Sequence, residues 1–281
     1  MAYEREVDVL TGAVREAGEA IARHYAEGAR VYTKADNSPV TDADLAANAI
    51  LVARLTAAFP DDAILSEEIQ PDAAVNVAAR CWIIDPLDGT AHFVARQPTF
   101  AVMVGLEIGG RPVVGAIYYP MTDECYVAVC GEGAMVARKG ETLPLRFAPA
   151  SFETARLGTT PGSFHTLTTG APRWTGDPAR FTLAGRGFCF RPKALETMFD
   201  GYIGMIADGL ASGGYPWDLC ATDLIVHEAG GLLTTVFGET YRYERAHERP
   251  YGGLVAARDA NLHAEMLARL SMIAGAGCSL P

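Results

Sequence analysis

The sequence lacks the features of membrane and nucleic-acid-binding proteins. No stretch reaches the roughly 18 uninterrupted apolar residues of a membrane helix, and residues 1–6 carry charges where a signal peptide is apolar. Lys and Arg total 23 against 34 Asp and Glu, a net charge of −11, and no basic run offsets this balance. We therefore expect a soluble, cytoplasmic protein that binds neither nucleic acid nor a membrane surface.

Several common catalytic and structural motifs are also missing. The six cysteines form no C-x-x-C pair and have mostly apolar neighbours, which argues against disulfides and a structural zinc site. The sequence contains no G-x-S-x-G, no P-loop and no H-E-x-x-H. An obvious covalent nucleophile is therefore absent. An acidic protein can still bind phosphorylated molecules where metal cations reverse the local field.

The composition is that of an ordinary globular protein. The chain has 281 residues, of which 49% are hydrophobic and 20% charged. This length suits one large domain or two closely packed halves. We expect a single unit over residues 1–281, with approximate subdomains 1–145 and 146–281, because residues 143–178 are rich in Pro, Gly, Thr and Ser.

Hydrophobic spacing predicts the helices. Apolar residues recur every three or four positions over residues 3–27, and Thr41 is placed to cap a second helix. The residues of that second helix expected to face the core are Leu45, Ala49, Val52 and Leu55. Further helices are expected at residues 195–210, 217–229 and 260–273. Gly230-Gly231 is expected to end the helix before it.

Short apolar runs predict the strands. They cover residues 63–65, 81–84, 100–108, 113–119, 125–129, 134–137 and 254–257. The runs between residues 99 and 136 fit an antiparallel meander, and residues 143–178 are expected to be loops with one strand near residues 155–158. Strands mixed with separate helical blocks indicate a layered α/β or α+β architecture.

The most informative motif is Asp85-Pro86-Leu87-Asp88-Gly89-Thr90, which follows an apolar strand. Two acids held so close repel unless a cation lies between them, and their hard oxygen ligands suit Mg²⁺. Thr90 is expected at a helix start, where backbone N–H groups favour an anion such as phosphate. The alternative is that both aspartates are only turn residues. A turn alone, however, requires neither the buried strand nor further acids elsewhere.

Further acids occur elsewhere, and each has a purely structural alternative. Glu67 and Glu68 end an earlier strand but could be a solvated loop pair. Asp218 opens a helix, where the helix dipole favours any acid. Asp44 follows Thr41 at the spacing of a capping box, so local evidence favours a structural role there.

Taken in order, these motifs resemble the inositol monophosphatase family of magnesium-dependent, lithium-sensitive phosphatases. The resemblance spans residues 34–231 and rests on the motifs as a set. These are Thr41-Asp42-Ala43-Asp44, Ser66-Glu67-Glu68, Asp85-Pro86-Leu87-Asp88-Gly89-Thr90, and Trp217-Asp218 followed, after eleven intervening residues, by Gly230-Gly231. It implies a layered αβαβα sandwich of the inositol monophosphatase and fructose-1,6-bisphosphatase type. It also implies a homodimer and hydrolysis of small phosphate monoesters by metal-activated water with two or three Mg²⁺ ions.

The resemblance also implies roles for individual residues. Glu67, Asp85 and the carbonyl of Leu87 match the ligands of one Mg²⁺. Asp85, Asp88 and Asp218 match those of a second ion. Asp44 and Glu67 match part of a third, weaker site. The pair that orients the attacking water matches Thr90 and Asp44. The backbone N–H groups that bind the phosphate match those of Gly89 and Thr90. The resemblance also places Asp218 near the substrate.

The substrate is less well defined by the sequence. Family members that act on inositol phosphates carry a glutamate seven residues before the Trp-Asp aspartate, whereas this chain has Ala211. Arg191 and Lys193 are candidate contacts to a second anionic group, or simply solvated cations near a helix start. We expect an inositol-1-phosphate-like polyol or sugar phosphate. The alternatives are 3'(2'),5'-bisphosphate nucleotidase, histidinol-phosphatase or fructose-1,6-bisphosphatase activity, and a catalytically weak regulatory or binding homologue.

Overall fold

The computed structural model describes residues 2–35, 37–69, 79–169, 178–184, 191–204, 214–243 and 253–274. The chain forms two compact units. Unit 1 comprises residues 1–145, 216–228 and 242–247, and unit 2 comprises residues 146–215, 229–241 and 248–281. A segment distant in sequence, residues 216–228, therefore completes the unit built by the N-terminal half.

Unit 1 is built on a seven-stranded sheet with the strand order β3-β4-β5-β6-β7-β8-β9. Strands β3 and β4 are parallel and every later neighbour is antiparallel, which confirms the expected meander. The strands are β3 (Ala63–Ser66), β4 (Arg80–Asp88), β5 (Ala101–Ile108), β6 (Arg111–Tyr119), β7 (Glu124–Val129), β8 (Gly133–Arg138) and β9 (Glu141–Leu145). A separate hairpin joins β1 (Val31–Thr33) to β2 (Pro39–Thr41).

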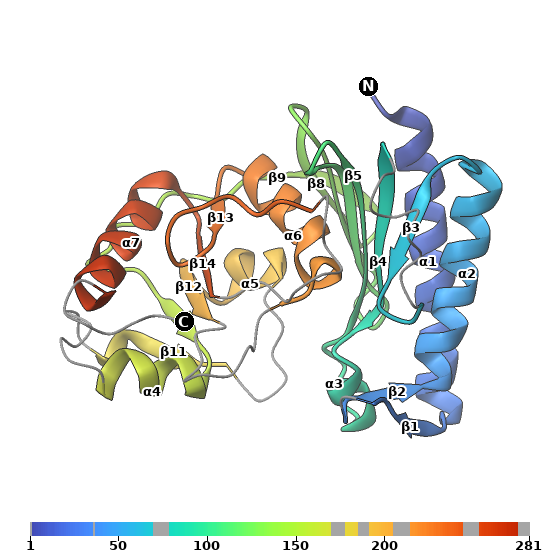
Figure 1. Cartoon of the computed structure of the whole chain (residues 1–281), viewed down its shortest axis with the longest axis horizontal. Coiled ribbons are helices and arrows are strands. Elements are labelled where there is room, and N and C mark those ends of the chain that lie inside the picture. The colour runs from blue at the N-terminus through green and yellow to red at the C-terminus, as the bar shows by residue number, and fades with distance from the viewer. Residues whose placement is uncertain are drawn as a thin grey trace. The chain divides into compact units, whose positions relative to one another are not determined.

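Helices cover both faces of this sheet. Figure 1 shows α1 (Glu4–Glu27) and α2 (Asp42–Ala58) on one face and α6 (Pro216–Glu228) on the other. The short α3 (Thr90–Val94) follows β4. Because β4 lies between α2 and α6, its side chains are buried on both faces, which explains its continuous apolar run. Unit 1 thus has a helix–sheet–helix layering.

The N-terminal helices form largely as their sequences predict. Helix α1 forms over the predicted range and buries apolar residues at the expected spacing, among them Leu10, Val14 and Ile21. It ends before Gly28, whose φ of 102° suits glycine. Thr41 caps α2, and Asp44 closes a capping box with it, as predicted. The expected core face of α2 was partly wrong, since Leu45 is 46% exposed and Ala49 is exposed as well. The buried residues of α2 are Ala43, Asp44, Ala47, Leu51 and Leu55.

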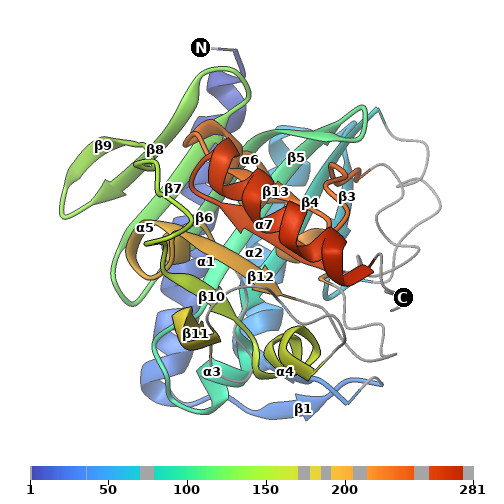
Figure 2. The same cartoon turned by 90° about the vertical axis from the view of Figure 1, so that its left-hand side faces the viewer.

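Unit 2 contains a five-stranded sheet with the order β11-β10-β12-β14-β13. Its strands are β10 (Leu157–Thr159), β11 (Phe181–Leu183), β12 (Gly201–Gly204), β13 (Leu232–Thr234) and β14 (Leu254–Ala257). Its helices are α4 (Pro161–Thr169), the 3-10 turn η2 (Pro178–Arg180), α5 (Pro192–Thr197) and α7 (Ala260–Ala274). In Figure 2, α7 crosses this sheet, where it packs on β14, and α4 packs beside β11.

Two expectations about unit 2 were wrong. The helix predicted over residues 195–210 ends at Thr197, and β12 follows it; residues 205–210 lie outside the described part of the chain. Glycines at both ends of β12 disfavour a helix, and pairing with β10 and β14 favours a strand. Residues 143–169 contain the end of β9, then β10 and α4, instead of loops with one strand.

None of the helices in the described residues combines the length and the apolar character needed to cross a bilayer.

Candidate metal centre

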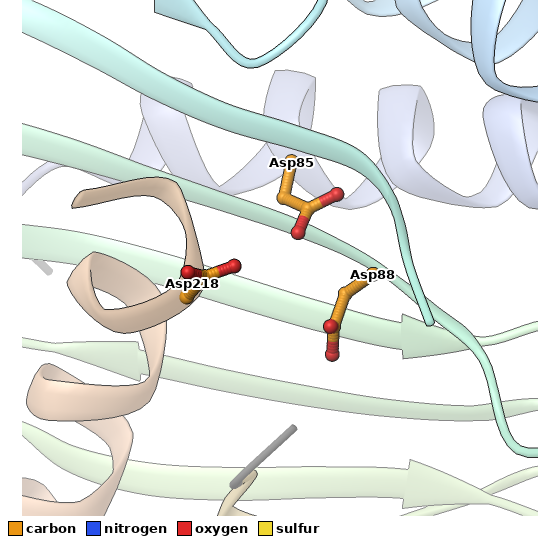
Figure 3. A group of neighbouring side chains, drawn as sticks. All are labelled: Asp85, Asp88 and Asp218. Carbon is orange, nitrogen blue, oxygen red and sulfur yellow. The ribbon is translucent and has the colours of Figure 1, made fainter. Parts of the chain in front are cut away.

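Three carboxylates from two elements of unit 1 meet at one place. Asp85 and Asp88 lie on β4 and Asp218 lies on α6, and one carboxylate oxygen from each lies within 4.8 Å of the others. Figure 3 shows the three side chains facing a common space. Asp85 is 1% exposed and Asp88 3%, and Asp218 is half-buried. We call Asp85, Asp88 and Asp218 the acidic triad. Ionised carboxylates this close repel by on the order of 3 kcal/mol per pair at an effective dielectric constant of about 20. The acidic triad therefore favours a bound cation.

A β-bulge places Asp85 and Asp88 on the same side of β4. Successive side chains of a regular strand alternate between faces, so residues three apart would point in opposite directions. Here Asp85 pairs with Met103 and Asp88 with Ala101, so β4 carries one residue more than β5 over this interval. Asp85 Oδ1 accepts a hydrogen bond from the N–H of Leu87 at 3.1 Å inside the bulge. The bulge therefore converts the spacing of the motif into a pair of converging carboxylates.

Asp44 lies against Thr90, the last residue of the Asp85–Thr90 motif. Asp44 is 1% exposed, and its Oδ2 accepts hydrogen bonds from the Thr41 N–H at 2.8 Å and the Thr41 hydroxyl at 2.6 Å. Its other oxygen, Oδ1, lies 2.9 Å from the hydroxyl of Thr90, which is also 3.1 Å from the Leu87 carbonyl oxygen. Burial raises the pKa of Asp44 above its usual range, although the hydrogen bonds from Thr41 and Thr90 oppose this shift.

Glu67 and Glu68 share one cation, Lys34. The Nζ atom of Lys34 lies 2.7 Å from Oε1 of each glutamate. Burial alone would lower the pKa of Lys34, but the charges and hydrogen bonds of the two glutamates raise it above its ordinary value. Burial raises the pKa of Glu67, Lys34 opposes this, and the charges of Glu68 and Asp44 add to it. A single ammonium thus faces two carboxylates, and negative charge is left over.

Within the described residues, the group that could hold an ion comprises Asp85, Asp88 and Asp218, without Glu67 or Asp44. The donors are carboxylates, which suit Mg²⁺, Ca²⁺ or Mn²⁺ better than softer metals. Both the buried charge of the triad and the surplus of carboxylates around Lys34 fit a divalent cation. The residues present therefore suit the metal that the sequence led us to expect.

The remaining predicted residues lie in several places. Gly89 has a φ of 90° and precedes α3, whose first residue is Thr90, as expected. Arg191 and Lys193 lie at the start of α5 in unit 2, where Arg191 is buried. Their contact with substrate stays a prediction. Ala211, at the position of the family's inositol-contacting glutamate, lies outside the described residues.

Sequence reasoning missed the part played by Lys34. The sequence motifs assign no role to this residue, yet the turn between β1 and β2 places its side chain against Glu67 and Glu68. The available signal was chemical: Lys34 is the first of three lysines in an acidic chain, and the turn residues next to it precede an acidic helix start.

Comparison with known proteins identifies relatives. A profile of the inositol monophosphatase family matches residues 3–273. The chain is 32% identical over 249 residues to the histidinol-phosphatase of Mycobacterium tuberculosis, covering 86% of this chain and 88% of that protein. It is 30% identical over 251 residues to inositol monophosphatase 2 of Solanum lycopersicum, covering 85% and 90%. Among solved structures, the extragenic suppressor protein suhB of Bartonella henselae matches with a TM-score of 0.74, 25% identity and coverage of 95% of this chain and 98% of that one. The expected mixed α and β fold is confirmed.

Proposed function

This chain belongs to the inositol monophosphatase family and is therefore a phosphoric monoester hydrolase. We propose that it hydrolyses a small phosphate monoester in a reaction that requires Mg²⁺. The observation that carries the proposal is the acidic triad of Asp85, Asp88 and Asp218, three carboxylates converging from two distant segments. Such a cluster is costly without a cation and is well suited to one.

The proposed ligands follow the motif positions. Asp85, Asp88 and Asp218 would hold one Mg²⁺, and Glu67, Asp85 and the Leu87 carbonyl a second. Asp44 and Glu67 would contribute to a third, weaker site. Bound there, Mg²⁺ supplies neutralisation of phosphoryl charge, stabilisation of the leaving oxygen and a lower pKa for a nearby water.

Other residues of the chain would position the reactants. The Thr90 hydroxyl, which can donate its hydrogen to Asp44, keeps lone pairs free to accept a hydrogen from the attacking water. The backbone N–H groups of Gly89 and Thr90 would donate to the phosphate. Asp218 would also lie against the substrate. Arg191 and Lys193 would contact a second anionic group, if the substrate carries one.

We propose an inositol-1-phosphate-like polyol or sugar phosphate as the substrate. The relative from Solanum lycopersicum, which is named an inositol monophosphatase, supports this choice. A second candidate is histidinol phosphate, because the relative from Mycobacterium tuberculosis is named a histidinol-phosphatase and has 32% identity. Enzymes of the family that act on inositol phosphates carry a glutamate at the position of Ala211. Because this chain lacks that glutamate, histidinol phosphate is included among the substrates to be tested.

We further propose that the enzyme is a cytoplasmic homodimer. The six cysteines, which form no C-x-x-C pair and argue against disulfides, support this location, and the family resemblance supports the dimer. A different role, as a regulatory homologue with weak activity, predicts a damaged set of carboxylates. Every carboxylate position of the motifs is filled in this sequence, which favours an active enzyme.

The deciding experiment measures phosphate release from a panel of esters before and after metal removal. The panel contains inositol 1-phosphate, histidinol phosphate, a 3',5'-bisphosphate nucleotide and fructose 1,6-bisphosphate. We expect no activity in chelator, recovery with Mg²⁺, and one preferred substrate. Activity that persists undiminished after exhaustive metal removal would refute the mechanism. Uniformly weak activity with all substrates would favour the regulatory role.

A further inference from the structure

Two glycines lie directly opposite each other on adjacent strands of the unit 1 sheet. Gly105 of β5 pairs with Gly115 of β6, so both side-chain positions at one cross-strand pair are empty. In an antiparallel sheet such paired positions face the same side, and the missing Cβ atoms leave a shallow depression there. We call this pair the glycine notch.

Helix α6 fills the glycine notch with Cys220 and Ala221. A methyl group at Gly105 would lie 2.5 Å from the Sγ of Cys220, and one at Gly115 would lie 3.2 Å from the Cα of Ala221. Both residues of α6 are buried, at 0% and 1% exposure. The notch therefore allows the backbone of α6 to approach the sheet more closely than side chains at these two positions would permit.

The glycine notch is close to the acidic triad along α6. Asp218 precedes Cys220 by two residues and Ala221 by three, which is about 3–4.5 Å of helix rise. The other two carboxylates of the triad are on β4, part of the same sheet as the notch. The depth of α6 on the sheet thus sets the distance between Asp218 and its two partners. Mg²⁺ requires near-ideal geometry at about 2.0–2.1 Å, so a shift of several tenths of an ångström matters.

The far part of α6 has its own anchors. Asp223, fully buried, contacts Arg111 at 3.1 Å and the hydroxyl of Tyr243 at 3.1 Å. Glu228 accepts hydrogen bonds from the backbone N–H groups of Gly131 and Gly133 at 2.7 and 2.8 Å. These contacts fix the register of the helix along the sheet, whereas the glycine notch lies closer to Asp218 along the helix than they do.

From this geometry we infer that Gly105 and Gly115 are positioning residues for the metal centre: they set the depth of α6 and so bring Asp218 to the distance from Asp85 and Asp88 at which one cation is shared. The inference rests on the proposed function, because it concerns the same acidic triad. It adds two residues without any polar side chain to the set on which metal affinity depends.

The test measures Mn²⁺ affinity of the full chain by electron paramagnetic resonance, together with the melting temperature. Mn²⁺ serves as the probe because it binds the same oxygen ligands as Mg²⁺. Gly105→Ala is expected to weaken Mn²⁺ binding by about tenfold or more, since the added methyl displaces Cys220 and with it the start of α6. Gly115→Ala, which meets backbone at a longer distance, is expected to weaken binding by a few fold.

Two variants separate positioning from general loss of stability. Gly18→Ala on α1 would overlap the ring of Tyr118, so it disturbs packing elsewhere in unit 1 without touching α6. It is expected to lower the melting temperature and leave Mn²⁺ affinity unchanged. Cys220→Ala removes the sulfur that the methyl of Gly105→Ala would strike, leaving the next neighbours at 3.2 and 3.3 Å. The double variant is expected to recover the Mn²⁺ affinity of Cys220→Ala alone.

The outcomes distinguish this inference from the proposed function. Normal Mn²⁺ binding by the unmodified chain, abolished by Asp218→Asn, establishes the acidic triad as a metal site. Unchanged affinity in Gly105→Ala and Gly115→Ala would then overturn the positioning role alone, as would a loss that Cys220→Ala fails to relieve. Absence of Mn²⁺ binding by the unmodified chain would overturn the proposed function and the positioning role together.

Discussion

The hydroxyl of Thr90 lies 2.9 Å from Oδ1 of Asp44, although the two residues are 46 positions apart in the sequence. The contact joins the start of α2 to the start of α3, beside the bulged end of β4. Asp44 therefore has two roles. One oxygen closes the capping box of α2, and the other is available to polarise the hydroxyl that we propose contacts the attacking water.

Replacing Thr90 with valine should remove this hydroxyl at nearly constant shape. We expect kcat to fall by about 10²- to 10³-fold, because a positioned proton acceptor is lost. The pKa of Asp44, already raised by burial, should rise further, since the Thr90 hydrogen bond favours its ionised form. The acid limb of the pH–rate profile should therefore move to higher pH.

The control for this prediction is Thr90→Ser, which keeps the hydroxyl. It should retain kcat within about tenfold of the unmodified enzyme and leave the acid limb in place. Equal losses of turnover in the serine and valine variants would show that loss of the hydroxyl alone does not explain the effect of changing Thr90.

Asp85 is shared by the first two of the proposed Mg²⁺ sites, so Asp85→Asn should be among the most damaging carboxylate substitutions. We expect kcat to fall by about 10³-fold or more, on the order of 4 kcal/mol of transition-state stabilisation. Without metal, the same variant should melt at an equal or higher temperature, because it relieves repulsion within the acidic triad. Its melting temperature should no longer rise with Mg²⁺.

Asp61→Asn is the matched control, since Asp61 is exposed and lies outside the triad. Its turnover and its Mg²⁺-dependent rise in melting temperature should equal those of the unmodified chain. Similar behaviour of the two variants would mean that the metal centre is assigned to the wrong residues.

The converging aspartates could be predicted from sequence because their chemistry is local. An apolar strand ending in two acids separated by Pro86 and Leu87 restricts the possibilities, and Thr41 with Asp44 is a capping box at the expected spacing. Asp218 was accessible through the ordered set of motifs. Each of these signals depends on a few neighbouring residues, which a sequence displays directly.

Long-range geometry was not accessible in the same way. The opposition of Gly105 and Gly115 depends on the register of two strands, and the part played by Lys34 depends on where a hairpin folds back. Strand β12 was predicted as part of a helix, because its pairing with β10 and β14 joins it to segments distant in the sequence. These features are set by tertiary contacts between distant segments.

Glu67 and Glu68 share Lys34 but should differ in what they contribute. Glu67→Gln should lower kcat by about 10²-fold or more, because it removes a charge from a proposed ligand. Glu68→Gln should keep turnover within about threefold. It should lower the free energy of unfolding by about 1 kcal/mol, because the Glu68 side chain is 6% exposed and that of Glu67 is 25% exposed. Steady-state kinetics and urea unfolding of both variants test this separation; a larger loss of turnover in Glu68→Gln would reverse the assignment.

The pair of His227 and Asp223 on α6 should make stability depend on pH near neutrality. His227 Nδ1 lies 2.7 Å from Asp223 Oδ1. Burial by itself lowers the pKa of His227, but the hydrogen bond and charge of Asp223 outweigh it, so the pKa lies above its ordinary value of 6.5. A raised pKa means that the folded state binds the proton more tightly than the unfolded chain. The stabilisation is therefore complete below the pKa of His227 in the unfolded chain and is lost as pH rises through its pKa in the folded state.

Urea unfolding of the unmodified chain and of His227→Gln tests this dependence. The free energy of unfolding of the unmodified chain should exceed that of His227→Gln by the largest amount at about pH 5.5, and this difference should shrink by about pH 9. A difference that stays constant over this range would show that the pair stabilises α6 without a proton-linked contribution.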